Sequence, residues 1–312
     1  MRRLATMLAT MLAVLVGAEL AVRLLADDLP EPVTWYHEIA QVKADQMEER
    51  QQPVDFVFAG TSQTYHGIDP DPIDTRLGSR SYNAGIPAGV PTVQRRWLFD
   101  AVLANLEVDT VVWSLSSVDL NARRPQQMES VYESALITRG GLLPAADRWL
   151  SERLALFRHR RTLADPQAWS NDEDPLEEAR RILLSSGKRK EGSRDLSERE
   201  RRRVRRIVGE FEVGGHMSDA VRDTVTELQR RGIDVVLVWL PEAPRFVDLL
   251  PDPAVHDEAR AEARRLAAEP GVPLLDVSDG FGDDDFIDYR HLGDRAAQEL
   301  SARLATMLPS PT

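Results

Sequence analysis

The residues best suited to chemistry in this chain are a serine near its beginning and an aspartate–histidine pair near its end. Ser62 closes the triplet Gly60-Thr61-Ser62, and Asp288 lies three positions before His291. A serine hydroxyl is a poor nucleophile until a base removes its proton. That base is usually a histidine, which a carboxylate orients. Ser62, Asp288 and His291 together therefore indicate the reactive centre of a hydrolase-like domain.

Each part of this set also has a plainer interpretation. A serine that follows a strand is often only an N-cap, and Asp-x-x-His also suits a capping aspartate with a surface histidine. The combination favours chemistry, because Ser62 follows the first predicted strand and the pair precedes the last predicted helix.

Apolar runs that alternate with helical segments must bring these residues together. This alternation predicts an α/β fold, a parallel sheet with helices on both faces. In such sheets, functional sites gather at the carboxyl ends of the strands. The predicted strands are 54–59, 81–83, 108–115, 233–240 and 273–277, and the predicted helices of this domain are 91–106, 217–231, 253–268 and 291–308.

Glycines at two strand ends suit an acyl-transfer site. Gly60 permits a tight turn that leaves the Ser62 hydroxyl beside unpaired N–H groups of a helix start, which can stabilise an oxyanion. Gly85, in Asn83-Ala84-Gly85, is a candidate for a further N–H donor, with a plain turn glycine as the alternative. Tyr65 and His66 are candidates for substrate contacts at the pocket mouth, although His66 fits a structural or surface position equally well.

The ordered blocks resemble the SGNH (GDSL-like) hydrolase superfamily. Its Gly-x-Ser turn matches Gly60-Thr61-Ser62, its glycine after a short strand matches Asn83-Ala84-Gly85, and its Asp-x-x-His matches Asp288-Tyr289-Arg290-His291. The resemblance covers roughly residues 54–120 and 216–308. It implies a flavodoxin-like three-layer α/β/α fold, with Ser62 as nucleophile, His291 as base and Asp288 as the acid that orients the base.

One block of the family is altered. The family usually carries Gly-x-Asn-Asp after the third strand, and its asparagine completes the oxyanion hole. Here the stretch reads Ser116-Ser117-Val118-Asp119, and valine has no hydrogen-bond donor. Asn121 and Ser117 are the candidates to replace this donor. If neither does, the loss of one such donor typically lowers turnover by about 10²–10³. The sequence therefore leaves two hypotheses: a working esterase or O-acyltransferase, or a catalytically inactive binding or scaffold protein.

The N-terminus predicts export and membrane attachment. Met1-Arg2-Arg3 precedes an apolar stretch, 4–26, long enough to cross about 30 Å of hydrocarbon. The basic start and the acids at 27–28 orient the remainder outside the cytoplasm. We expect residues 1–28 to be a transmembrane signal anchor of a single-pass membrane protein with an extracytoplasmic catalytic domain. The alternatives are a signal peptide cleaved after Val16-Gly17-Ala18 and a soluble cytoplasmic esterase.

The remaining chain is expected to have two further parts. Residues 29–53 read as a linker and a polar helix, and 54–312 as the SGNH-like domain with a helical cap inserted at about 121–215. Within the cap, the cluster Arg199–Arg206 suggests either a site for an anionic polymer or lipid headgroup or, as we prefer, a solvated helix face interleaved with glutamates.

Composition excludes several classes of function. The net charge of −12 argues against a nucleic-acid partner, and the absence of cysteine excludes disulfides and thiolate chemistry. We expect no cofactor and no metal site, because the run Asp283–Asp285 lacks the spacing of a calcium loop.

An anchor combined with an altered block resembles the exported SGNH-like proteins of cell-envelope polymer modification. Examples are proteins of alginate O-acetylation and lipoteichoic acid D-alanylation, which work beside membrane-bound O-acyltransferases. The resemblance implies an acylated glycan or lipid as substrate and a membrane-bound O-acyltransferase as partner.

Overall fold

The computed structural model describes residues 2–25, 38–50, 52–123, 150, 153–160, 163, 175–190 and 192–311. The chain forms two compact units. One contains Met1–Gln41 and Ser134–Arg181, and the other contains Val42–Glu133 and Ile182–Thr312. These limits differ from the predicted parts 1–28, 29–53 and 54–312, and the predicted division into an anchor, a linker and a capped domain stays a prediction.

The larger unit is built on a parallel sheet of five strands in the order β2-β1-β3-β4-β5. This is the flavodoxin-type strand order, in which β2 is added on one side of β1 and the later strands on the other side. The predicted parallel three-layer α/β fold is therefore confirmed. The strands are β1 Val54–Ala59, β2 Ser81–Asn83, β3 Val108–Leu115, β4 Asp234–Trp239 and β5 Leu274–Asp276.

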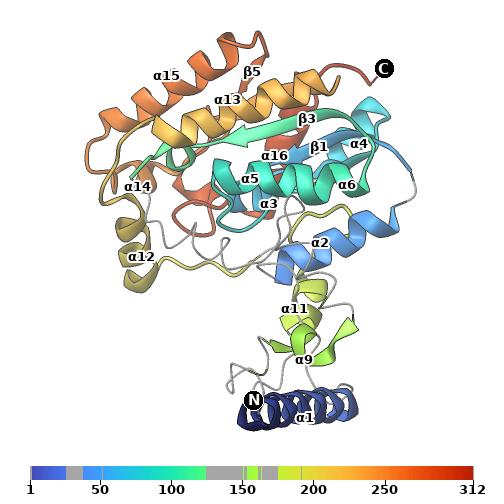
Figure 1. Cartoon of the computed structure of the whole chain (residues 1–312). Coiled ribbons are helices and arrows are strands. Elements are labelled where there is room, and N and C mark those ends of the chain that lie inside the picture. Colours follow the sequence, from blue (N-terminus) through green and yellow to red (C-terminus); the bar gives the residue numbers. More distant parts are fainter. Residues whose placement is uncertain are drawn as a thin grey trace. The chain divides into compact units, whose positions relative to one another are not determined.

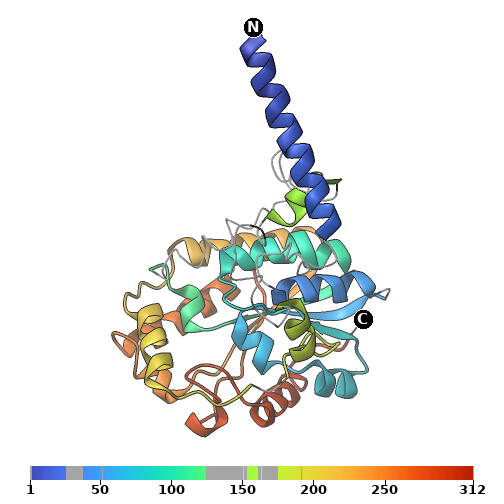
Figure 2. The same cartoon turned by 90° about the horizontal axis from the view of Figure 1, so that it is seen from below.

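Helices cover both faces of this sheet (Figures 1 and 2). On one face, α13 packs against α5 and α15; on the other, α16 packs against α3 and α4. Both faces are therefore shielded from water, as a parallel sheet of continuous apolar strands requires. The helices of the first group are α5 Pro91–Trp97, α13 Gly215–Arg230 and α15 Ala254–Ala268, and those of the second are α3 Ser62–Gly67, α4 Pro70–Leu77 and α16 Asp294–Leu304.

Alternate residues of the strands supply the core beneath α16. Phe56 and Phe58 of β1 belong to one buried cluster with Val112 of β3, Val238 of β4 and Leu300 of α16. Their spacing of two along each strand places these side chains on the same face of the sheet. The core thus fixes α16, and with it the loop that precedes this helix.

Two predicted helices differ clearly from the observed ones. The last helix begins at Asp294 and not at His291, so His291 lies in the preceding loop. The predicted helix 91–106 is interrupted after α5 by a π-helical turn, Leu98–Val102, before the short α6 Leu103–Asn105. The remaining short elements of this unit are η3 Ser117–Leu120, α14 Pro244–Val247 and η5 Asp283–Asp285.

The described parts of the predicted cap contain helices joined by irregular segments. The helices include α9 Ala155–Arg158, α11 Pro175–Ile182 and α12 Glu198–Val208. In α12, Val204 and Val208 are buried in the core of the α/β unit, while most arginines of the Arg199–Arg206 cluster are exposed. This arrangement fits the solvated helix face that we preferred for the cluster.

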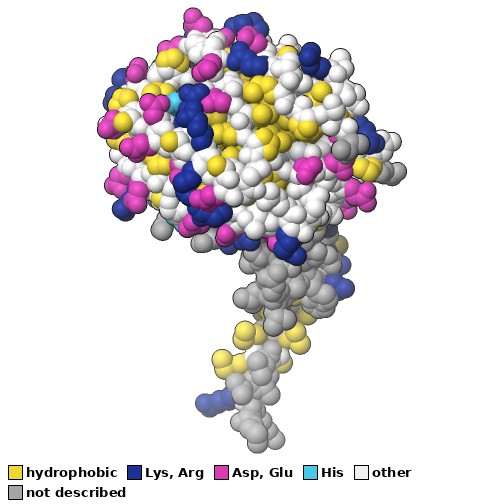
Figure 3. Space-filling model, turned by 90° about the horizontal axis from the view of Figure 1, so that it is seen from above, with side chains coloured by type: hydrophobic (Ala, Val, Ile, Leu, Met, Phe, Trp, Pro, Cys, Tyr) yellow, Lys and Arg dark blue, Asp and Glu magenta, His cyan; other side chains and the backbone are white. Residues whose placement is uncertain are grey.

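Charge on the α/β unit is mixed and not separated. The face shown in Figure 3 carries acidic and basic side chains interspersed around an apolar area. Between α13 and α15, for example, Arg222 donates to Glu269 at 2.8 Å. This face therefore has no large patch of one sign of charge.

The smaller unit contains α1 Arg2–Leu25. Its Glu19 carboxylate accepts hydrogen bonds from Arg23 at 2.6 Å and from the N–H groups of Ala155 and Leu156 at 2.9 and 2.8 Å. In the described part of the chain, no helix combines the length and apolarity needed to span a membrane, so the predicted transmembrane helix has no support from the structure. The helix α2 Glu38–Glu49, most of which belongs to the larger unit, lies where the polar helix was expected.

Candidate active site

Ser62 lies at the carboxyl edge of the sheet, on the first turn of α3. The preceding Gly60 has a φ of +148°, and a Cβ there would lie 2.0 Å from Thr64 Oγ1 and 3.2 Å from the Ser114 carbonyl oxygen. Only glycine fits this turn without strain. The N-cap is Thr61, whose hydroxyl accepts the Gln63 N–H at 3.3 Å. The capping function is thus filled by Thr61, and the Ser62 hydroxyl is left for another partner.

That partner is His291. Ser62 Oγ lies 2.8 Å from His291 Nε2, although the two residues are 229 positions apart in the chain. His291 Nδ1 lies 2.6 Å from Asp288 Oδ2. Because a carboxylate can only accept, Nδ1 carries the proton of the neutral ring and Nε2 is free to accept the proton of Ser62. The structure therefore brings together Ser62, His291 and Asp288, in the arrangement that serine activation requires.

The backbone around Asp288 fixes its carboxylate. Asp288 Oδ1 accepts the N–H groups of Arg290 at 2.7 Å and of His291 at 2.9 Å, which leaves Oδ2 directed at the imidazole. Burial raises the pKa of Asp288, but the hydrogen bond and charge of His291 and the two backbone donors outweigh it and hold this pKa well below its usual range. Asp288 is therefore an anion at any pH where His291 is neutral.

Burial also acts on the candidate base. It lowers the pKa of His291 below its ordinary value of 6.5, against the opposing effect of Asp288, and the nearby Arg290 and Arg189 add to the lowering. At neutral pH the ring is consequently uncharged and able to take a proton, which is the state a general base must occupy.

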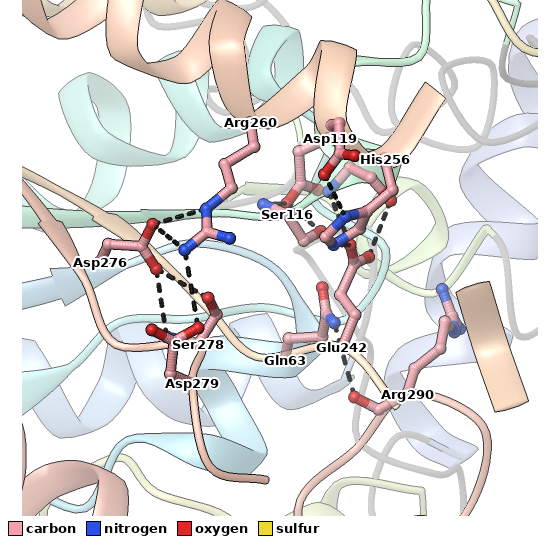
Figure 4. A network of polar contacts seen from close by, with 12 residues as sticks. Gln63, Ser116, Asp119, Glu242, His256, Arg260, Asp276, Ser278, Asp279 and Arg290 are labelled. Carbon is pink, nitrogen blue, oxygen red and sulfur yellow. Dashed lines mark hydrogen bonds and ion pairs between the residues drawn. The ribbon is translucent and has the colours of Figure 1, made fainter. Parts of the chain in front are cut away.

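The loop that carries the pair is closed on itself and bound to α3. Phe286 and Leu292 form an isolated antiparallel bridge, and both side chains are buried in the core. Across the loop, the Ile287 N–H donates to the His291 carbonyl oxygen at 2.9 Å. The Gln63 side chain, beside Ser62, reaches the Arg290 carbonyl oxygen at 3.5 Å (Figure 4). The serine and its proposed base are thus linked by contacts outside the triad itself.

Gly85, the predicted further oxyanion donor, lies in close contact with α3. Its N–H donates to Asn83 Oδ1 at 3.0 Å and is therefore already engaged. A Cβ at this position would lie 2.7 Å from Tyr65 N and 2.9 Å from Thr64 Cβ. Gly85 is thus a point of close approach between the loop after β2 and the helix that carries Ser62. These contacts account for the glycine without an oxyanion role.

Asn121 and Ser117, the predicted replacements for the missing asparagine, are also engaged elsewhere. Asn121 donates to the Glu210 carbonyl oxygen at 2.9 Å and accepts the N–H groups of Arg123 and Glu212 at 3.0 Å each. Its amide thus joins the two ends of the inserted segment. Ser117 Oγ donates to Glu242 Oε1 at 2.8 Å.

Val118, in turn, points into the hydrophobic core. Its side chain is buried in the cluster that includes Phe58 and Val112. The turn it belongs to is fixed by Asp119, whose carboxylate accepts the Ser116 N–H at 2.8 Å and the Ser116 hydroxyl at 2.7 Å. This capping box directs the loop so that residue 118 faces inward.

Tyr65 and His66, the candidates for substrate contacts, are both buried. The His66 ring stacks on the ring of His291, with centroids 4.4 Å apart and planes at 27°. Its Nε2 lies 2.9 Å from Arg189 Nη1. Sequence reasoning missed Arg189, because no spacing in the inserted segment indicates that this residue reaches the site.

The described residues offer no cluster of His, Cys, Asp or Glu that could hold a metal ion. The groups that the site brings together are a hydroxyl, an imidazole and a carboxylate. Such a set suits nucleophilic attack on a carbonyl carbon followed by proton transfer.

Comparison with known proteins adds a likeness in structure. The chain matches no family model and no curated protein. Similar solved structures include a GDSL-like lipase from Bacteroides thetaiotaomicron (11% identity, 86% of this chain and 95% of that chain, TM-score 0.44). Others are a lipase/acylhydrolase from Enterococcus faecalis (13%, 83% and 99%, 0.41) and the carbohydrate acetylesterase Est24 from Sinorhizobium meliloti (14%, 81% and 97%, 0.39). At these values the likeness decides nothing about activity, which is inferred from the geometry of the site.

The position of Val118 generates a prediction. Val118→Asn should lower the free energy of unfolding by roughly 1–3 kcal/mol, because an amide would be buried among apolar side chains, and it should not raise ester hydrolysis. Val108→Asn, at a half-buried position at the start of β3, should cost less. Urea denaturation and initial-rate assays measure both effects. A Val118→Asn protein of unchanged stability and higher turnover would show that residue 118 reaches the site.

Proposed function

We propose that this chain is a serine ester hydrolase or O-acyltransferase with Ser62 as nucleophile, His291 as general base and Asp288 as its orienting acid. The observation that carries the proposal is the unbroken hydrogen-bonded chain from Ser62 Oγ through both ring nitrogens of His291 to Asp288. The two distances, 2.8 and 2.6 Å, lie within hydrogen-bonding range for proton transfer.

The reaction proceeds in two halves. Ser62 Oγ attacks the acyl carbon while its proton passes to His291 Nε2, and the carbonyl becomes an oxyanion. As the bond to the leaving oxygen breaks, His291 returns the proton to the departing alcohol, which leaves an acyl-Ser62. Water or an acceptor hydroxyl then attacks this ester, His291 takes its proton, and Ser62 is released with that proton.

Support for an oxyanion site comes from the start of α3. The N–H groups in the first turn of a helix have no acceptor within the helix. The N–H of Ser62 belongs to this turn and lies on the same residue as the nucleophile. It is therefore the donor that we propose first for the oxyanion, in place of Gly85 and Asn121.

The proposed substrate is an acyl ester on a cell-envelope glycan or lipid, and the proposed partner is a membrane-bound O-acyltransferase. Attachment to a membrane is proposed through α1, on the outer side of the cytoplasmic membrane. The support is the apolar sequence of α1 and its exposed large side chains, among them Met11, Leu12, Val14, Leu15 and Val16. Exposed apolar side chains in such number favour a lipid environment over water.

A second candidate function, a catalytically inactive binding or scaffold protein, is favoured by one observation. Val118 is buried, and the side chains of Asn121 and Ser117 are bonded to other groups, so the usual side-chain oxyanion donor is missing among these three. Binding of acetylated polysaccharide without hydrolysis would support this alternative.

The proposal predicts the effect of substitutions in the triad. Ser62→Ala and His291→Ala should each lower the kcat for p-nitrophenyl acetate by about 10⁴-fold or more, and Asp288→Asn by about 10⁴-fold. The reason is that each substitution removes either the Ser62 hydroxyl or a group needed to activate it. The matched control is Ser278→Ala, a serine that lies after β5 and is bonded to Asp276. Its turnover should match that of the unmodified chain. Equal turnover in Ser62→Ala and the unmodified chain would exclude the proposed mechanism.

A fractionation experiment tests the proposed attachment. The full chain expressed in a bacterial host should sediment with membranes, while a chain that lacks residues 1–25 should remain in the supernatant. Extraction at alkaline pH would release a surface-bound helix and leave a spanning one in the pellet. Recovery of the full chain in the cytosolic fraction would contradict the proposal and favour a soluble esterase.

A further inference from the structure

We propose that Arg189 and His66 are positioning residues for the base: Arg189 holds His66 as a neutral ring, and this ring supports one face of the His291 imidazole. The inference rests on the proposed function, because it concerns the base of that reaction. Neither residue touches the Ser62 hydroxyl through a described hydrogen bond, and both act through His291.

Arg189 is in direct contact with the His66 ring. Arg189 Nη1 lies 2.9 Å from His66 Nε2. A guanidinium has only donors, so Nε2 of His66 must present its lone pair and the ring must carry its proton on Nδ1. The backbone N–H of Arg189 donates to the Tyr65 carbonyl oxygen at 3.1 Å, which fixes the arginine against α3. His66 is therefore kept uncharged by geometry.

The imidazole rings of His66 and His291 are stacked. Both nitrogens of His291 are used, one by Ser62 and one by Asp288, so only the faces of its ring remain for support. His66 covers one face at 4.4 Å between centroids. The position of His291 Nε2 relative to the serine thus depends on this contact as well as on Asp288.

The charge state of His66 matters at the moment of proton transfer. When His291 takes the serine proton it becomes a cation, and a neutral ring against its face adds no charge that opposes this cation. A protonated His66 would instead place a second positive charge at the same distance and oppose the transfer. The hydrogen bond from Arg189 prevents this second protonation.

The surroundings of His66 act in the same direction. Burial lowers its pKa well below the ordinary value, and the charges of His291, Arg189 and Lys188 add to the lowering, while Asp288 opposes it. The Lys188 ammonium is itself bonded to Asp294 at 2.7 Å and lies 3.7 Å from Asp69. Arg189 is thus the neighbouring cation that bonds directly to the His66 ring.

The experiment measures kcat/KM for p-nitrophenyl acetate against pH in the full chain. Arg189→Met removes a donor and a charge that oppose protonation of His66 and His291, so the pKa of each ring should rise, although burial still holds both down. The acid limb of the profile should therefore move upward by roughly half a pH unit or more. The double variant Arg189→Met/His66→Phe keeps a stacked ring that cannot titrate, so its acid limb should move back toward the original position.

Two controls separate this role from a general effect on folding. Arg189→Lys retains a donor and a positive charge and should keep the original midpoint. Arg194→Met, at an exposed arginine in the same segment, should leave the whole profile unchanged. Circular-dichroism melting verifies that each variant is folded, and the ¹⁵N shifts of the His66 ring in the unmodified chain should report the Nδ1–H tautomer.

The outcomes are distinct. An acid limb that stays in place in Arg189→Met, or does not return in the double variant, overturns the inference while leaving the proposed function intact. A protonated or Nε2–H His66 in the ¹⁵N spectrum also overturns it. Absence of Ser62-dependent hydrolysis in the unmodified chain overturns the proposed function itself and the positioning role with it.

Discussion

The hydrogen bond between Ser62 Oγ and His291 Nε2 is the contact on which the rest of the site depends. It joins the ends of a domain that are 229 positions apart in the chain, and only tertiary structure can hold it. The strand order places β1 inside the sheet, and α16 packs beneath it on α3. Since Ser62 opens α3 and His291 lies just before α16, the packing of these two helices sets the distance between base and nucleophile.

Buried polar contacts hold α3 in place beneath this hydrogen bond. The Asn83 side-chain amide donates to the carbonyl oxygens of Thr64 and Ile68 at 2.8 and 2.7 Å, and the backbone carbonyl oxygen of Asn83 accepts Lys43 Nζ at 2.6 Å. Burial lowers the pKa of this lysine well below its ordinary value. The helix that presents Ser62 is thus tied to β2 and to α2 through satisfied buried groups, which favour one fixed geometry.

Much of the frame was predictable from the sequence, while the supporting contacts of the site were not. Strands 54–59 and 108–115 were predicted to the residue, because apolar runs bounded by turn residues are a local signal. The meeting of Ser62 with Asp288 and His291 followed from their places beside predicted elements, whereas their catalytic role stays a prediction. The hydrogen bonds of Gly85 and Asn121 and the reach of Arg189 depend on how loops dock, which no spacing encodes.

Reaction of the purified chain with a fluorophosphonate probe, followed by peptide mapping, tests the central claim most directly. A serine made nucleophilic by His291 should form one covalent adduct, located on Ser62, and the rate of its formation should fall as the pH drops and His291 becomes protonated. An unmodified chain after prolonged exposure, or an adduct on another serine such as Ser117 with Ser62 unlabelled, would contradict the assignment of Ser62 as an activated nucleophile.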